Sequence, residues 1–353
     1  MYKKDTSREK ESKIDHCMKY YFLLIRYCKI ILAVSKGGNE MVEDNQIKAQ
    51  VSPFAIREGE IKTFDGKDGY VSMNQIVHKI NIGHITDIHF AILELVNEFE
   101  FITSRQLYQM LEWKGIDPKS QDKLNNKLEQ LVKSKILTRY YFTSEEGKGI
   151  YRIYCLEKMG KYLLNSKEIE CKWQQTDNVK PVPMIKKRLA GNQTLIAYLR
   201  KVKAFDSYVV KPTLNAKISG KVFKATGGSV KLSKNNKSIT FLFEVIRREP
   251  DWEKKLADKM AMYKEFYENF VPGDSGFPNL PQLILVCEDD KHTAESFKEI
   301  VKNKLEIPQI KLYFTTDLRQ NSETLENTLI EFRIDEETKK YKMFNVEVKI
   351  LGI

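Results

Sequence analysis

The chain has few cysteines and histidines, and neither residue type is spaced as in a metal or redox site. The five cysteines include no Cys-x-x-Cys pair, which excludes the usual zinc and dithiol motifs: Cys17, Cys28, Cys155, Cys171 and Cys287. Scattered, unpaired cysteines are typical of a reducing compartment, so we expect a cytoplasmic protein. The histidines contain no His-x-His pair: His16, His78, His84, His89 and His292. We therefore expect no metal and no cofactor.

Long apolar runs and nucleotide-binding loops are also lacking. No Gly-x4-Gly-Lys-Ser/Thr sequence is present, which excludes a P-loop ATPase. The longest apolar run, Tyr20–Val34, is interrupted by Arg26 and Lys29 and is shorter than the roughly 20 residues of a membrane span. We therefore expect no stable membrane insertion.

The first forty residues differ from the rest and form a doubtful N-terminal extension. Lys36-Gly37-Gly38 can be encoded by a strong bacterial ribosome-binding sequence, and Met41 follows at a suitable spacing. We therefore hypothesise that translation starts at Met41 and that residues 1–40 are a mis-assigned extension. A peptide from residues 2–30 in the native protein would contradict this hypothesis.

The composition describes an ordered protein with an excess of positive charge. The chain has 353 residues, 42% of them hydrophobic and 30% charged, which is enough for two or three domains. The net charge of +11 favours a polyanionic partner, because lysine and arginine neutralise phosphates and release counterions. The alternative is that the charge serves only solubility.

The pattern divides the chain into four segments after the extension. Residues 41–82 form an arm with turns or a hairpin, and residues 83–168 form a helical unit that ends in two strands. Residues 169–183 are polar, carry two prolines and indicate a linker. Residues 184–353 alternate helices with apolar strands, which predicts an α/β domain.

Three consecutive helices are predicted in residues 83–168. Thr86 and Asp87 can cap the first helix, and the second begins after Thr103-Ser104. The third covers residues 118–135, with Asp117 as its N-cap and Pro118 in its first turn. Leucines and a valine at helical spacing give this third helix one buried face: Leu124, Leu128, Leu131 and Val132.

The opposite face of the third helix is polar and basic, and it makes this helix the candidate recognition helix. Lysine suits phosphates or guanine edges, whereas asparagine and glutamine can bond adenine with both amide atoms. The residues on this face are Lys119, Lys123, Asn126, Gln130 and Lys133. The alternative is an ordinary solvated helix face, in which the same residue types are common.

A basic hairpin follows the third helix. Residues 136–142 and 150–154 read as strands, and residues 144–149 read as the turn between them. Arg139, Lys148 and Arg152 are expected to contact backbone phosphates. A helix-turn-helix followed by such a hairpin predicts a winged helix, which most often places a helix in the major groove of double-stranded DNA. Winged helices also mediate protein contacts, and this alternative stays open.

The C-terminal segment predicts a mixed sheet covered by helices. The helices are expected at 184–204, 251–270 and 293–304. The strands are expected at 207–210, 229–232, 238–247, 281–287 and 310–315. Strands 238–247 and 281–287 are almost continuously apolar, as strands buried on both faces are.

The order of these elements, with the segments around 241–245, 263–267, 283–286 and 312–316, resembles the replication-relaxation family. The resemblance covers roughly residues 85–325. It implies a winged helix joined to a restriction-endonuclease-like sheet in a plasmid or integrative element. It further implies an accessory protein in plasmid replication or conjugative relaxation, acting at an origin of transfer or replication. The partners it implies are a relaxase, a replication initiator, a coupling protein or a second copy of the chain.

The nuclease motif of such a sheet is incomplete here, so we expect no enzymatic activity. A working site needs an aspartate on one strand and Glu-x-Lys on the next, to hold a divalent cation. Glu244 stands at the glutamate position, but Ile246 replaces the lysine and residues 228–232 carry no carboxylate. Glu244 is expected instead to pair with Arg247 or a lysine. Two other functions stay open: a winged-helix transcriptional regulator, and a metal-dependent nuclease with unusual ligands.

Overall fold

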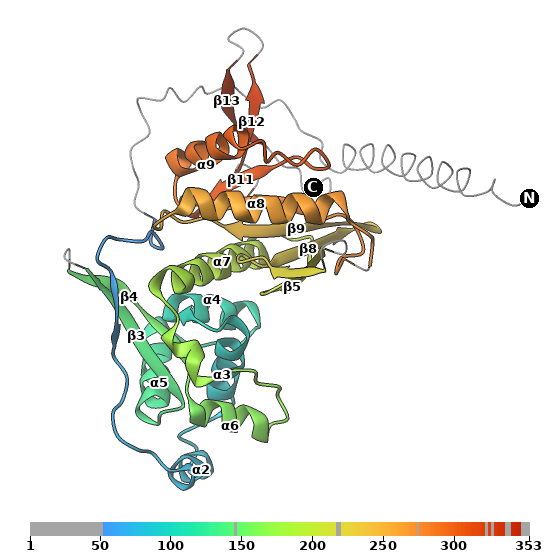
Figure 1. Ribbon diagram of the computed structural model, residues 1–353. Coiled ribbons are helices and arrows are strands. Elements are labelled where there is room, and N and C mark those ends of the chain that lie inside the picture. Colours follow the sequence, from blue (N-terminus) through green and yellow to red (C-terminus); the bar gives the residue numbers. More distant parts are fainter. Residues whose placement is uncertain are drawn as a thin grey trace, which may run out of the picture.

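The computed structural model describes residues 52–144, 147–216, 220–273, 275–321, 324–325, 328–335 and 340–346. Our predictions for residues 1–40, with the start at Met41, lie outside these residues, and so does the tip of the basic hairpin. The described part is a mixed α/β structure with two principal sheets (Figure 1). Within it, no helix combines the length and the apolar character needed to cross a membrane.

The N-terminal half contains helices packed on a small antiparallel sheet. Its elements in chain order are β1 (Ile61–Phe64), α2 (Met73–Asn81), α3 (Asp87–Phe99), β2 (Ile102–Thr103), α4 (Ser104–Trp113), α5 (Gln121–Lys133), β3 (Leu137–Ser144), β4 (Gly147–Leu156) and α6 (Lys158–Ser166). The strand order is β1-β3-β4-β2, so the β3–β4 hairpin forms the centre of this sheet.

Side-chain caps fix where these helices begin. The Thr103 hydroxyl accepts a hydrogen bond from the Gln106 amide at 3.2 Å, and the Gln106 side chain accepts one from the Thr103 amide at 3.1 Å. This reciprocal pair is a capping box, which satisfies two amides that the helix itself cannot. It ends β2 and starts α4 at the position that the sequence predicted.

Helix α5 begins three residues later than predicted. The expected N-cap, Asp117, accepts a hydrogen bond from the Lys119 amide at 2.7 Å and so closes a turn before the helix. Lys119 has a φ of 69°, a left-handed conformation that an α-helix cannot contain. Ser120 is the N-cap, and its hydroxyl accepts from the Lys123 amide at 3.2 Å. The predicted buried face of α5 is confirmed, because its three leucines and Val132 are buried.

The C-terminal half is built on a seven-stranded mixed sheet with the order β13-β12-β11-β10-β9-β8-β5. Strands β9, β10 and β11 are parallel, and the other pairs are antiparallel. The strands are β5 (Phe205–Val209), β8 (Ser229–Lys234), β9 (Lys237–Val245), β10 (Gln282–Cys287), β11 (Tyr313–Thr316), β12 (Leu329–Ile334) and β13 (Tyr341–Val346). The helices are α7 (Val182–Lys201), α8 (Trp252–Glu268), α9 (Asp290–Lys302) and α10 (Asp317–Gln320).

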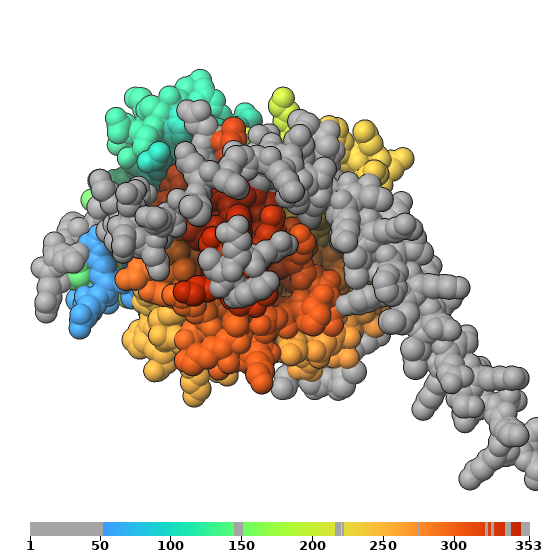
Figure 2. Space-filling model, turned by 90° about the horizontal axis from the view of Figure 1, so that it is seen from above, coloured from blue at the N-terminus to red at the C-terminus, as the bar shows by residue number. Residues whose placement is uncertain are grey.

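Helices cover both faces of this sheet. Along β9, Phe241 and Phe243 belong to the apolar core shared with α7, whereas Leu242 belongs to the core shared with α8 and α9. Successive side chains of a strand point to opposite faces, so both faces of β9 are buried, as its apolar run predicted. Helix α8 lies along β9 in Figure 1, and orange and red C-terminal residues make up the middle of the coloured surface in Figure 2.

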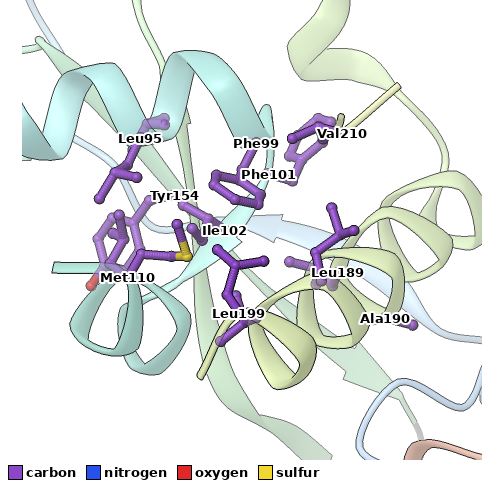
Figure 3. Close-up of a cluster of buried hydrophobic side chains, with 14 of the residues drawn as sticks. Leu95, Phe99, Phe101, Ile102, Met110, Tyr154, Leu189, Ala190, Leu199 and Val210 are labelled. Carbon is purple, nitrogen blue, oxygen red and sulfur yellow. The ribbon is translucent and has the colours of Figure 1, made fainter. Parts of the chain in front are cut away.

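Helix α7 joins the two halves through a continuous core. Leu189 and Leu199 of α7 pack in one buried cluster with Phe99, Phe101 and Met110 of the N-terminal helices (Figure 3). The Asn192 amide also donates to the Phe101 carbonyl at 2.7 Å, and this bond links α7 to the turn before β2. Helix α4 therefore packs on the helix that starts the C-terminal half.

Residues 169–183, predicted as a linker, pack against the structure. They include a short 3-10 helix, η1 (Gln175–Val179), and the buried side chains of Cys171 and Asn178. The Asn178 amide donates to the Leu156 carbonyl at 2.8 Å, and its oxygen accepts from the Trp173 indole at 3.1 Å. These contacts attach the segment to the end of β4.

Several elements were absent from our predictions. Helix α2 and strand β1 lie in the segment read as an arm, and β1 extends the hairpin sheet by pairing with β3. The small hairpin of β6 (Thr213–Ala216) and β7 (Lys221–Lys224), α10, and the strand pair β12–β13 were also missed.

Candidate nucleic-acid interface

Lys123 and Asn126 are the residues on the polar face of α5 whose side chains are available to bind another molecule. Both side chains are exposed, and within the described residues neither makes a hydrogen bond or an ion pair. They lie three positions apart, so they share one helix face opposite the buried leucines. A phosphate and an adenine edge are the partners that these side chains suit.

Gln130 lies on the same face, but its amide oxygen is already bonded. Nδ1 of His89 accepts from the Thr86 amide at 3.0 Å, so Nε2 carries the proton and donates to the Gln130 oxygen at 3.0 Å. Burial lowers the pKa of His89 and keeps its ring neutral, which maintains this arrangement. The two-point contact with adenine that we expected of Gln130 needs that oxygen, so in this conformation Gln130 links α5 to α3.

Two of the predicted lysines are paired with carboxylates. Lys119 lies before α5 and forms an ion pair with Asp117 at 2.9 Å. Lys133 is in the last turn of α5 and lies 3.6 Å from Glu129. Both lysines are exposed, and Glu129 keeps its bond to Arg139 when Lys133 leaves, so the two pairs contribute little stability. The two lysines can therefore exchange their carboxylate for a phosphate at small cost.

Arg139 lies inside the structure rather than on its surface. Its side chain is 10% exposed, bonds the Glu129 carboxylate at 2.6 Å and lies 2.9 Å from the Asp65 carboxylate. These two carboxylates come from α5 and from the turn after β1, so Arg139 fixes the helix to the hairpin. The Arg139 guanidinium is therefore a structural group, and it does not belong to the exposed surface around α5.

Arg152 is the exposed arginine of the hairpin. Its side chain is 53% exposed and lies 3.0 Å from the same Asp65 carboxylate that holds Arg139. Asp65 is thus shared by a buried and an exposed guanidinium. The side chain of Lys148 lies outside the described residues. The structure therefore places Lys119, Lys123, Asn126, Lys133 and Arg152 at the surface.

Neither Asp65 nor His89 could be recognised from the sequence as part of this region. Asp65 lies 74 residues before Arg139 and belongs to a segment read as an arm. His89 lies on the buried side of the amphipathic helix α3, so its position in the sequence does not distinguish it from an ordinary core residue. The packing of α3 against α5 brings His89 to Gln130, and the pairing of β1 with β3 brings Asp65 to Arg139.

Glu244 of β9 is enclosed by donors from α8 and from the segment between β7 and β8. Its carboxylate accepts from the Tyr263 hydroxyl at 2.6 Å and from the Thr226 hydroxyl at 2.8 Å, and it lies 3.5 Å from the Lys259 ammonium. Of the two expected partners, the lysine is therefore present, whereas Arg247 pairs with Asp317 at 2.8 Å. Among the described residues, no three His, Cys, Asp or Glu side chains are grouped as metal ligands would be.

Comparison with known proteins identifies no family for this chain. No family model matches it, and no curated protein matches it. Among solved structures, it is similar to one of the restriction endonuclease FokI, with 9% identity and a TM-score of 0.22. The similarity covers 66% of this chain and 42% of the FokI chain. A likeness at this level carries no argument about fold or activity.

Proposed function

We propose that the protein binds double-stranded DNA through α5. Elements α3, β2, α4, α5, β3 and β4 follow one another in the order of a winged helix, and β2 completes the hairpin sheet beside β4. In that fold the third helix enters the major groove. The observation that carries the proposal is the exposed, unpaired face of Lys123 and Asn126 on this helix.

The arrangement assigns different roles to the residues on this face. Asn126 reads a base, while Lys123 and the exposed lysines and Arg152 around it contact phosphates. The net charge of +11 supports the same partner. We propose further that the protein is an accessory factor of a plasmid or integrative element, acting at its origin of transfer or replication. This context rests on the family resemblance of the element order alone.

The first experiment measures binding of the full chain to duplexes by fluorescence anisotropy at several salt concentrations. Asn126→Ala is expected to weaken binding to the preferred sequence by about 1–3 kcal/mol and to leave other duplexes unaffected. Lys123→Gln is expected to weaken binding to every duplex and to lower the salt slope by about one. Lys203→Gln, an exposed lysine beyond α7, is the matched control and leaves both quantities unchanged.

The choice of duplexes separates an origin-binding protein from a transcriptional regulator. Tighter binding to the origin of the element that carries the gene supports the accessory role, and tighter binding to its promoters supports the regulator. If Asn126→Ala and Lys203→Gln behave alike on all duplexes, α5 is not the recognition helix. Absence of duplex binding at low salt would refute the proposal as a whole.

We propose also that the C-terminal sheet is not a nuclease. Apart from the inserted β6–β7 hairpin, its elements α7, β5, β8, β9, α8 and β10 follow the order that we expect of an endonuclease-like core. The support is that the Glu244 oxygens already accept from Tyr263 and Thr226, with Lys259 beside them. Incubation with supercoiled plasmid and Mg²⁺ or Mn²⁺ is expected to leave the plasmid intact. Cleavage that disappears in Glu244→Ala would make the protein an enzyme.

A further inference from the structure

A cavity of about 200 Å³ lies between α7 and α8, beside the end of β9, and the DNA-binding face of α5 does not take part in it. Lysines from both helices line it: Lys187 of α7, and Lys255 and Lys259 of α8. The other charged groups of its wall are Glu244, Glu249 and the Arg247 guanidinium. Trp252 contributes an aromatic wall.

The charge of this cavity is positive. Arg247 is neutralised by Asp317, which it bonds with one nitrogen at 2.8 and 3.0 Å. The three lysines face two carboxylates, so the cavity wall carries an excess of one positive charge. Lys187 and Lys255 both bond Glu249, the latter at 2.9 Å, while Lys259 lies near Glu244.

The carboxylates are engaged, whereas the ammonium groups keep N–H donors that bond no acceptor among the described residues. Burial raises the pKa of Glu249, but the bonds from Lys187 and Lys255 outweigh it, so the pKa lies below its usual value and the group is charged. Each ammonium has three N–H groups, and Lys187 and Lys255 each use one on Glu249. Lys259 donates one to the Lys224 carbonyl at 2.8 Å.

A divalent cation fits this wall poorly. It would meet three ammonium groups, and it would have to displace the hydroxyls of Tyr263 and Thr226 from Glu244. An anion with several acceptor oxygens suits this wall, because it can accept hydrogen bonds from the remaining lysine N–H groups while both carboxylates keep their present partners. A phosphate group is a small anion with several acceptor oxygens, and the compact ammonium group of lysine is a common ligand for it.

We propose that this cavity binds a phosphate group, held by Lys187, Lys255 and Lys259. The phosphate is either a phosphodiester of a DNA strand that reaches the C-terminal half or the phosphate of a free nucleotide. The site binds and positions the group, and no bond is made or broken there.

The test compares two double variants of α8 in the full chain. Lys255→Gln with Lys259→Gln removes two cavity lysines, and Lys254→Gln with Lys264→Gln removes two lysines of the same helix that do not line the cavity. Calorimetric titration with inorganic phosphate and with adenosine monophosphate measures the site directly. Salt-dependent duplex binding measures whether DNA uses it.

The cavity variant is expected to bind phosphate at least tenfold more weakly than the wild type, and the control variant is expected to bind as the wild type does. If DNA is the source, the cavity variant also lowers the salt slope of duplex binding by about one. If a nucleotide is the source, the monophosphate binds more tightly than inorganic phosphate and the slope is unchanged. Either result supports the site.

Equal phosphate binding by both variants and the wild type would overturn the proposal. So would Mg²⁺ binding that is lost in Glu244→Gln and kept in the cavity variant, because that result defines a cation site. The Lys255 side chain is 51% exposed, so Lys255→Gln is expected to fold as the wild type does. This single variant can replace the double variant if the latter does not fold. A wild type that binds phosphate here but no duplex would refute the proposed function and leave this site standing.

Discussion

Replacing Glu100 with glutamine tests the contact that joins the N-terminal helices to α7. Glu100 follows α3, and its side chain is 13% exposed. It pairs with Lys180, with Lys211 at 2.7 Å and with Arg188 of α7 at 3.5 Å. In Glu100→Gln, these three cations keep their positions and lose their common carboxylate.

The size of the effect follows from the burial of the partners. Removing one partner of a buried ion pair costs about 3–5 kcal/mol. Lys180 and Lys211 have side chains that are 26% and 36% exposed, so both can turn partly to water. We therefore expect Glu100→Gln to lower the free energy of unfolding by about 3 kcal/mol, the lower end of that range.

The pH dependence gives a second, independent readout. Burial raises the pKa of Glu100, but the bonds from Lys180 and Lys211 outweigh it and hold the pKa below its usual value. The unfolded state therefore binds the proton first as pH falls. The contribution of Glu100 is complete above the unfolded pKa of about 4.3 and is lost as pH falls through the folded-state pKa.

The assay is urea unfolding followed by circular dichroism at pH 7 and at steps down to pH 3. Glu94→Gln, an exposed glutamate on the same helix, is the matched control. The difference between the two variants is expected to shrink as the solution becomes acidic. A loss in Glu100→Gln that equals the loss in Glu94→Gln at pH 7 would refute the reasoning.

Three further changes test other parts of the structure. Gly160→Ala is expected to lower the free energy of unfolding by about 1–3 kcal/mol, because the alanine Cβ would lie 2.4 Å from the Ile136 carbonyl oxygen. Helix propensity alone predicts that alanine stabilises α6, so a higher free energy of unfolding in urea would contradict the steric argument. Burial lowers the pKa of His292 to about 3, so this group alone is expected to lower wild-type stability by up to about 1.4 kcal/mol per pH unit as pH falls below about 6, and this part of the loss is expected to be absent in His292→Gln. Arg139→Gln is expected to lower the melting temperature without changing the salt slope of DNA binding, since its guanidinium bonds carboxylates; a changed slope would mean that Arg139 contacts phosphate.

Elements with a strong apolar period could be predicted from the sequence. The spacing of the buried residues of α5 is helical, and the short length of the apolar runs in β9 and β10, with their β-branched and aromatic residues, favours strands. The start of α5 was placed three residues too early, because Asp117 caps a turn rather than the helix and the left-handed backbone of Lys119 keeps residues 118 and 119 out of the helix. Helix α2 was missed because Ile76 is its only buried residue.

The polar face of α5 shows where sequence reasoning stops. The period placed Lys123, Asn126 and Gln130 on one side, and that geometry is present in the structure. The period carries no information about what approaches that side, and the approach of His89 from α3 removes Gln130 as a free amide. The buried position of Arg139 likewise depends on Asp65, a residue far away in the chain. Long-range partners, rather than secondary structure, separate a binding residue from a structural one here.

Helix α7 packs against both halves of the molecule, so the proposed DNA-binding surface and the cavity beside α8 cannot be separated by cutting the chain between the halves. Its Leu189 covers the cluster of Phe99, Phe101 and Met110, and the Gln106 side chain of α4 donates to its backbone at 2.8 Å (Figure 3). A fragment that ends in the predicted linker would lack α7 and would leave this cluster in water. Each apolar side chain so exposed forfeits about 1.5–3 kcal/mol, which is comparable in sum to the stability of a whole domain. The proposed DNA-binding face of α5 therefore needs the full chain for its support, and point variants rather than truncations are the means to distinguish it from the cavity beside α8.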